Sequence, residues 1–367
     1  MENINELLLH SKTKEEIIGL KQHILGVENN HSKLTNEDRL LNKVRLMRAH
    51  ILLWEIDEAE VISAELRERT HEMTVEIIYF YHKYNGNIAY ARKHFELSLL
   101  LYLQAYEVIP ETTRNSLQGL EIADLHYSIC LAAQWTSHLD LVEEHSPIAL
   151  EIYENNDNLK RVSELYTNMS IVESKLMNFQ RSLKCLEKAL YYARSTNCWK
   201  VRFPALYNYA LACMKFKNYD KCIQNCEIGI QAMPESMKFE RFVLFLMQAK
   251  AFRDQKNLSA ANETILKAGY VLESMEEHEK PMLHFEDFLM EYKVAKLHIL
   301  GYTEEYVKFM KAEFLPRIEK IGNDYDIRYY YKQLNEFFIE RNDIEGIMSI
   351  LLKVNELLLR SDSNVAT

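Results

Sequence analysis

A pattern of small residues that recurs about every 40 positions constrains the fold of this chain more than any other feature of its sequence. Within each unit the key positions are separated by intervals of twelve, four and three. The units end at Ala105, Ala149, Ala189, Gly229 and Ala268, which keeps the repeat step almost constant. Helices that cross closely need small side chains at their contact, and this spacing predicts antiparallel helical pairs of the tetratricopeptide type. The five complete sets are Gly86, Ser98, Tyr102 and Ala105; Cys130, Val142, Ser146 and Ala149; Ser170, Ser182, Leu186 and Ala189; Ala210, Cys222, Cys226 and Gly229; and Ala249, Ala261, Ile265 and Ala268.

Two less regular helical pairs follow these five sets. They read FEDFLMEYKVAKLHI with EEYVKFMKAEFLPRI, and YYYKQLNEFFIERN with GIMSILLKVNELLL. Only 9 glycines and 6 prolines occur among the 367 residues, which favours long helices joined by short loops. The sequence therefore predicts an all-α chain in which residues 71–360 form a right-handed tetratricopeptide-repeat superhelix of about seven helical pairs.

The segment before the repeats, residues 1–70, lacks this pattern. Its apolar spacing predicts three helices, at about 13–26, 36–54 and 57–69, with Asn36 as the N-cap of the second. We therefore predict that residues 1–70 form a separate N-terminal three-helix bundle. Residues 361–367 are polar and terminal, and we expect a frayed tail there.

Charge and composition exclude several classes of function. The formal net charge is −10, from 54 acidic and 44 basic residues, and no run rich in Lys or Arg offers a basic face for nucleic acid. We therefore predict no direct nucleic-acid binding. The first residues lack the positive charge of a signal peptide, and no window approaches the length of apolar sequence that crosses a bilayer, so we expect no membrane span. Six cysteines without a secreted-domain spacing indicate a reducing, cytoplasmic location.

Two asparagines occupy the same position in successive repeats and are candidate peptide ligands. Asn168 and Asn208 each lie two positions before the small residue of the first helix, one repeat step apart. Stacked pairs form a concave wall lined mainly by their first helices, and an amide can both donate to and accept from a peptide backbone. The alternative is that these amides satisfy neighbouring backbone groups inside the protein.

A basic series lies toward the end of the same first helices. It comprises Lys175 and Lys215, with Lys250 and Arg253 slightly offset. In an acidic protein, cations along one wall would attract a peptide carboxylate or an acidic side chain. We predict that Lys175, Lys215 and Arg253 contribute to peptide binding, although a lysine on a solvated helix face needs no function.

No catalytic or metal-binding pattern is present. Cys222 and Cys226 lie four apart on one helix face, but both occupy close-packing positions and no further ligand completes a set of four, which favours buried thiols. The 13 histidines show no ligand spacing, and YNGNIAY lacks the lysine of a phosphate-binding loop. We predict no catalytic residue, no metal and no cofactor.

With these features the chain resembles the Rap, NprR, PlcR and PrgX (RRNPP) family of peptide-pheromone regulators, and the Rap and NprR branch in particular. The repeat step near 40 positions is similar to that branch, as is the segment at 163–224 that contains LYNYALA. The C-terminal FFIERNDIEGIMSILLKVNELL resembles the family's last repeat, and RLLNKVRLMRAHILL resembles part of its N-terminal bundle. The family's LYNIG pattern carries the asparagine that holds the pheromone backbone, and this matches Asn208 alone.

The resemblance implies a cytoplasmic quorum-sensing receptor. Its ligand would be a short imported signalling peptide, and its partner a response regulator or another regulatory protein, bound through the N-terminal bundle. Solenoids of this kind often form homodimers through exposed end repeats, so a homodimer is possible. The resemblance also leaves open a response-regulator aspartyl phosphatase of the Rap type. Phosphatase members place a glutamine near the start of the bundle's second helix, where this chain reads Asn36, Glu37, Asp38 and Arg39. A generic tetratricopeptide scaffold is the third reading.

Overall fold

The computed structural model describes most of the chain as α-helix. The described residues are 4, 7–8, 13–29, 34–109, 119–136, 138–176, 178–196, 198–280, 285–321 and 324–365. By its internal contacts the chain divides into two compact units, Met1–Ala212 and Cys213–Thr367, and the division falls within one helix. No strand occurs in the described ranges, and none of their helices is long and apolar enough to span a membrane. The predicted all-α tetratricopeptide class is confirmed.

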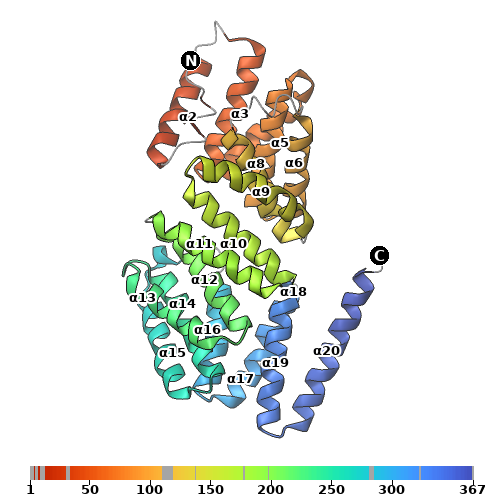
Figure 1. The fold of residues 1–367 in the computed structure, drawn as a ribbon. Coiled ribbons are helices and arrows are strands. Elements are labelled where there is room, and N and C mark those ends of the chain that lie inside the picture. Colours follow the sequence, from red (N-terminus) through yellow and green to blue (C-terminus); the bar gives the residue numbers. More distant parts are fainter. Residues whose placement is uncertain are drawn as a thin grey trace. The chain divides into compact units, whose positions relative to one another are not determined.

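The helices follow one another as antiparallel pairs, which can be traced along the chain in Figure 1. Three helices precede the predicted repeats: α2 (Lys14–Asn29), α3 (Asn36–Leu52) and α4 (Ile56–Arg67). The five predicted pairs are α5 (Val75–Ala91) with α6 (Phe95–Val108), α8 (Gly119–Thr136) with α9 (Leu139–Asn155), α10 (Leu159–Lys175) with α11 (Phe179–Ser195), α12 (Trp199–Lys215) with α13 (Tyr219–Ala232), and α14 (Lys238–Asp254) with α15 (Leu258–Glu273). The last two pairs are α16 (Phe285–Ile299) with α17 (Thr303–Phe309) and α18 (Leu315–Ile321), and α19 (Asp324–Glu340) with α20 (Ile344–Val365).

The small-residue positions lie where the two helices of a pair meet. Every residue of the five sets is buried. In the first and third pairs a serine fixes the crossing: Ser98 Oγ donates to the Gly86 carbonyl at 2.9 Å, and Ser182 Oγ donates to the Ser170 carbonyl at 2.9 Å. The same bond thus recurs at the same position of two repeats.

The pair α3–α4 has the geometry of a repeat, although its sequence does not show the pattern of small residues. Met47, Ala59, Ser63 and Leu66 stand at intervals of twelve, four and three, and all four are buried. The turn after α3 holds Trp54 at a φ of 63°. One residue of positive φ also occurs in the α5–α6, α12–α13, α14–α15, α16–α17 and α19–α20 turns: Lys93, Lys217, Lys256, Gly301 and Asn342. The sequence predicted both helices but not their repeat register, because Met47 and Leu66 are large.

The buried core continues from α3 through the first repeats, because apolar residues of α3, α4 and α5 belong to the same cluster as those of α8 to α11. Whether residues 1–70 act as a separate effector-binding region stays a prediction. A smaller cluster around Leu8, Ile17, Ile24, Leu46 and Ala49 holds α2 against α3.

Two local predictions need correction. The N-cap of α3 is Thr35, not Asn36, because the Thr35 side chain accepts from the Asp38 N–H and Asp38 accepts from the Thr35 N–H, a complete capping box. The predicted frayed tail at 361–367 is helical as far as Val365, and the last two residues lie outside the described ranges. No glycine or proline stands at 361–365 to end the helix.

The last two pairs depart from regular geometry in a way that their sequence explains. The segment between α17 and α18, Met310–Phe314, forms a π-helical turn. Pro316 lies just beyond it, and a proline removes the backbone donor that the preceding turn would use. On α20, four apolar side chains (Ile344, Met348, Leu351 and Leu352) are exposed. A homodimer through an end repeat stays a prediction.

The close crossing in the first repeat gives a first test. A Cβ added at Gly86 in α5 would lie 2.5 Å from the Tyr102 ring, so Gly86→Ala overpacks a buried contact at a cost of about 1–3 kcal/mol, which exceeds the gain in helix propensity of about 1 kcal/mol. We expect a lower urea midpoint. Gly19→Ala in α2 meets nothing within 4 Å and serves as the matched control, which should be as stable as the parent or more so. Equal midpoints for the two variants would contradict the close crossing.

Candidate functional site

Asn168 is a buried amide that has no hydrogen-bonding partner in the described part of the chain. It lies in the middle of α10, only 2% exposed, and neither its Nδ2 nor its Oδ1 has a partner among the described residues. Leaving a buried polar group unpaired costs about 1–3 kcal/mol. Such a group is retained when something else satisfies it, so Asn168 is the strongest candidate ligand contact in the first unit.

Asn208 stands at the same repeat position on α12, yet its surroundings differ. It is half-buried, and its Nδ2 donates to the Pro204 carbonyl at 2.8 Å, one turn earlier in the same helix. One part of the amide is therefore already used inside the helix, as the structural alternative for these asparagines anticipated. A role of Asn208 in peptide binding stays a prediction.

Lys175 and Lys215, the predicted cations, end two first helices. Lys175 Nζ donates to the Gln134 carbonyl at 2.6 Å. Gln134 lies in the last turn of α8, where carbonyls lack helical partners and a cation is favourable, so Lys175 has a structural function. Lys215 is half-buried at the end of α12. Their contribution to peptide binding stays a prediction.

Arg253, in the second unit, is buried and engaged with its neighbours. Its Nη2 lies 2.6 Å from Asp254 Oδ1 and donates to the Tyr329 hydroxyl at 3.2 Å. Lys250, one turn earlier, pairs with Glu291 at 3.0 Å and donates to the Tyr330 hydroxyl at 3.2 Å. These cations join the first helices α14, α16 and α19, and a peptide would contact Arg253 only by displacing internal partners.

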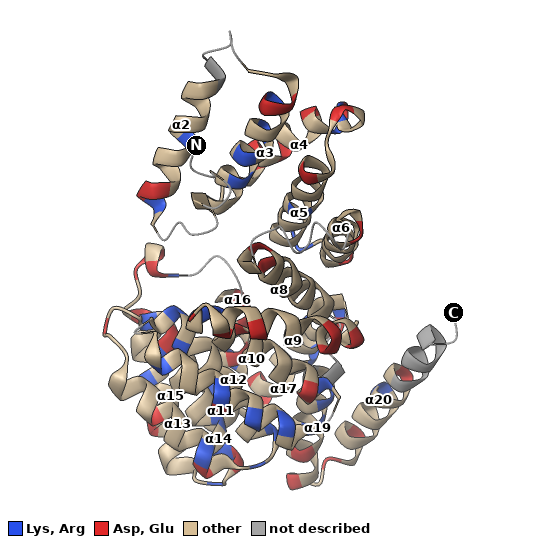
Figure 2. Ribbon diagram, turned by 45° about the horizontal axis from the view of Figure 1, so that its top comes forward, with Lys and Arg blue, Asp and Glu red and all other residues tan. Residues whose placement is uncertain are grey.

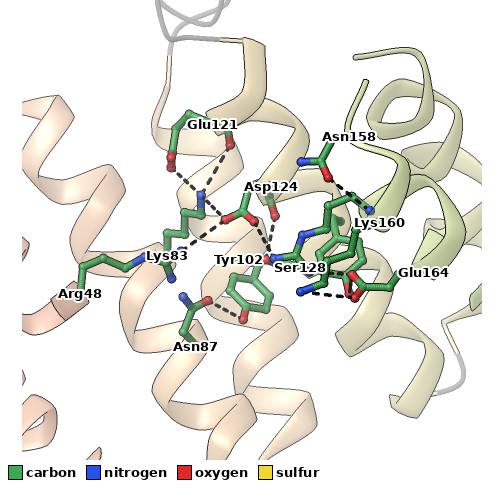
Figure 3. Close-up of polar contacts among 12 residues, drawn as sticks. Arg48, Lys83, Asn87, Tyr102, Glu121, Asp124, Ser128, Asn158, Lys160 and Glu164 are labelled. Atoms are coloured by element: carbon green, nitrogen blue, oxygen red, sulfur yellow. Dashed lines mark hydrogen bonds and ion pairs between the residues drawn. The ribbon is translucent and has the colours of Figure 1, made fainter. Parts of the chain in front are cut away.

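Sequence analysis missed a buried ionic network in the first unit, shown in Figure 3. Lys83 on α5 is 1% exposed and contacts Glu121 at 2.5 Å and Asp124 at 2.9 Å, both on α8. Asp124 also attracts Arg161 of α10 at 3.6 Å and Arg48 of α3 at 3.9 Å. The network (Arg48, Lys83, Glu121, Asp124 and Arg161) thus connects the first helices of four consecutive pairs.

Electrostatics keep this network charged. Burial alone would raise the pKa of the Asp124 carboxyl, but Lys83, Arg48 and Arg161 lower it well below its usual value. The carboxylate therefore stays ionised across the physiological range, and its attraction for three cations is lost only in strong acid. Because its polar groups are paired internally, this part of the first helices offers few free groups to a ligand.

Tyr127 and Glu164 contact the Arg161 end of the network. The Arg161 guanidinium lies over the Tyr127 ring, 4.3 Å from its centroid, and pairs with Glu164 at 2.9 Å. Glu164 also accepts from the Tyr127 hydroxyl at 3.0 Å. Asp124 and Glu164 stand one repeat step apart at the same repeat position, six before the small residue. This shared repeat position is the sequence signal that could have revealed the network. The two asparagines were identified by the same kind of signal.

No metal centre can be assembled from the described residues. No group of three or more His, Cys, Asp or Glu side chains could hold a metal ion there. His126 and His145 face each other with their Nδ1 atoms 2.7 Å apart, as one buried hydrogen-bonded pair. Cys222 and Cys226 are fully buried, and their mutual contact together with burial raises the pKa of Cys226, so this thiol is unreactive. Acidic and basic residues both occur along the helices, as the red and blue ribbon segments of Figure 2 show.

Comparison with known proteins gives a consistent result. No family model matches the sequence. The chain is 23% identical over 329 residues to the transcriptional activator NprA of Geobacillus stearothermophilus, covering 87% of this chain and 77% of that protein. Its fold is similar to that of the apo quorum sensor NprR from B. thuringiensis, with a TM-score of 0.77 at 17% identity over 97% of this chain and 96% of the other.

Two Rap proteins share the fold as well. Apo RapI aligns with a TM-score of 0.75 at 12% identity, over 96% of this chain and 97% of RapI. A Rap protein in complex with competence and sporulation factor aligns with a TM-score of 0.69 at 14% identity, over 97% of this chain and 96% of the other. The resemblance to the Rap and NprR branch is confirmed.

The unpaired amide of Asn168 gives a second test. Asn168→Leu keeps the approximate volume and removes both unsatisfied atoms, so we expect the ligand-free protein to gain about 1 kcal/mol or more in free energy of unfolding. Urea unfolding measures the gain. Asn225→Leu is the control, because the amide of Asn225 is accessible to solvent and donates to the Lys221 carbonyl at 2.7 Å. A loss of stability in Asn168→Leu would show that the amide is satisfied inside the protein.

Proposed function

Because the chain resembles the Rap and NprR branch of the RRNPP family in both sequence and fold, we propose that it is a cytoplasmic quorum-sensing receptor. It binds a short imported signalling peptide on the first helices of its repeats. Peptide binding then switches its interaction with a partner protein, such as a response regulator or a transcription factor. NprR, described as a quorum sensor, and the Rap protein in complex with competence and sporulation factor support this proposal.

The buried amide of Asn168 is the observation that carries the proposal. Its position on α10 adjoins the internally paired network, because Glu164 precedes it by one turn and contacts Arg161. Among the described residues, Asn168 is thus an unpaired donor and acceptor next to a network whose charged groups are paired with one another. A peptide backbone supplies both missing partners whatever its side chains are, which is suited to recognising an extended peptide.

Partner binding is assigned to the N-terminal region. Residues 1–70 resemble the bundle through which Rap proteins bind their effectors, and α3 is tied to the repeats by Arg48, which contacts Asp124. A ligand that alters α5, α8 or α10 would therefore change the contacts of α3 as well. This coupling through Asp124 is how we propose that binding reaches the partner surface.

Calorimetry with a pooled synthetic library of short peptides tests the binding claim. After a binding peptide has been isolated from the pool, we expect Asn168→Ala to weaken its affinity by at least about tenfold, the effect of losing buried hydrogen bonds worth about 1.4 kcal/mol. Asn208→Ala should weaken it less, because that amide already donates within its helix.

The control is Asn225→Ala, which removes a solvent-accessible amide with the same helical hydrogen bond as Asn208. Its affinity should equal that of the parent. If Asn168→Ala binds as tightly as the control, Asn168 is not part of the site, and a library without any binder would favour the generic scaffold.

The second candidate is an aspartyl phosphatase, favoured by the fold shared with Rap proteins. At the start of α3, where the family's phosphatases place a glutamine, Asn36 Nδ2 donates to Glu72 at 2.7 Å and Asn36 Oδ1 accepts from Arg69 at 2.5 Å. Hydrogen bonds from Arg69, which contributes most, and from Asn36 lower the pKa of Glu72 to about 2. An amide held in this way is poorly placed to orient an attacking water.

We therefore expect no phosphatase activity. The decay of a phosphorylated receiver domain, followed by loss of its radioactive label, should be the same with and without the protein. Acceleration of that decay would establish the phosphatase, and loss of the acceleration in Asn36→Ala would locate it at the start of α3.

A further inference from the structure

The second unit contains five buried or half-buried polar side chains with an enclosed hydrogen-bonding atom that has no partner among the described residues, and three of them concern us here. They are Tyr306 on α17, fully buried, with its hydroxyl unpaired; Gln333 on α19, 7% exposed, with both amide atoms unpaired; and His298 on α16, with Nδ1 unpaired. Each enclosed donor or acceptor that lacks a partner lowers the stability of a fold. These three side chains hold four of the six such atoms in the described part of the second unit, so their missing partner is best sought outside the chain.

Two of these side chains contact one aromatic residue. The His298 ring stacks on Tyr306, with centroids 4.8 Å apart, and both rings contact Phe337, at 5.8 Å and 4.9 Å. Gln333 precedes Phe337 by one helical turn and shares its face of α19. We call His298, Tyr306, Gln333 and Phe337 the end cluster, since it lies near the C-terminal ends of α16 and α19.

Three cations border the end cluster. Arg253 pairs with Asp254, and Lys256 pairs with Glu340 at 2.7 Å. Arg341 packs on the Phe337 ring at 3.7 Å and donates to the Thr303 hydroxyl at 3.3 Å, and no described carboxylate lies within ion-pair distance of it. The border therefore carries an excess of one positive charge.

The charge of the border acts on the cluster itself. Burial, then Arg253, Arg341 and Lys256, lower the pKa of His298 to about 3. The imidazole is neutral above that pH, and the same cations that exclude a proton would attract an anion.

We propose that the end cluster binds a carboxylate group of the signalling peptide, which rests on the proposed function. A phenol O–H, an amide N–H₂ and an imidazole N–H are donors of the kind that the two oxygens of a carboxylate accept. One excess positive charge matches a monoanion, whereas a phosphate dianion would need a further unpaired cation. The side chain of Arg341, which packs on Phe337, is exposed.

Small peptide fragments test this on the full chain. N-acetylglycine carries a free C-terminal carboxylate, and N-acetylglycinamide is its neutral counterpart. N-acetylaspartate 1-amide carries only a side-chain carboxylate, and N-acetylaspartate diamide is the neutral counterpart of that fragment. Ligand-detected NMR should give saturable binding of N-acetylglycine, at least tenfold tighter than that of N-acetylglycinamide. Equal binding of the two aspartate fragments would assign the site to a C-terminus; tighter binding of the 1-amide would admit acidic side chains as well.

Two variants locate the carboxylate. Tyr306→Phe and Gln333→Leu remove only unpaired atoms, so they should melt no lower than the parent while weakening N-acetylglycine at least tenfold. Tyr302→Phe, on an exposed tyrosine of the same turn, should leave it unchanged. In protein labelled with carbon-13 at histidine, N-acetylglycine should also move the His298 signals in the parent and not in Gln333→Leu.

Failure of this proposal is separable from failure of the proposed function. If the acid and amide fragments bind alike, the end cluster holds only water and the carboxylate site is wrong, whatever the peptide library shows. If Asn168→Ala does not affect peptide binding but the fragments discriminate, the carboxylate site stands without the assigned backbone contact.

Discussion

The close crossing of the two helices in each pair is the constraint on which the rest of this structure depends. Where Ser98 donates to the Gly86 carbonyl and Ser182 to the Ser170 carbonyl, the helices approach so closely that only small side chains fit. That contact fixes the rotation of each first helix about its axis. As a consequence, residues one repeat step apart point in equivalent directions. Residues at the same repeat position therefore form a row across successive first helices.

The charged residues show what such a row can do. Asp124 and Glu164 share a repeat position, and the cations that meet them come from the helices before and after. The first helices α3, α5, α8 and α10 are therefore joined by ion pairs as well as by apolar packing. A buried ionic network adds little net stability compared with apolar packing, but breaking one member is costly. Such a network favours one arrangement of the helices over others, which is the property that a switch between two arrangements requires.

The sequence predicted the helical pairs well because their intervals follow from helix geometry alone. At α3–α4 it predicted both helices but missed the repeat register, because Met47 and Leu66 occupy positions that smaller residues hold in the repeats. It also treated Asn168 and Asn208 as equivalent, since register cannot reveal that one amide is enclosed while the other bonds to the Pro204 carbonyl. Burial and partners depend on side chains from other helices, and a spacing rule contains no information about them. Arg253 is the same case: its position suggested an accessible cation, and its neighbours Asp254 and Tyr329 enclose it.

The unpaired groups are the strongest link between the physics of this fold and its function. Elsewhere in the described chain, buried charges such as Lys83 are paired, so the fold is able to satisfy polar groups when it buries them. Several described groups depart from that rule at a cost in stability: the Ser146 and Tyr153 hydroxyls, Asn168 in the first unit, and Tyr306 with Gln333 in the second are among them. An apolar residue of similar size would remove the cost at each position. Because a polar residue is present where an apolar one would be more stable, we infer that its partner comes from outside the chain. The two sites match different groups: a peptide backbone amide at Asn168 and a carboxylate at the end cluster.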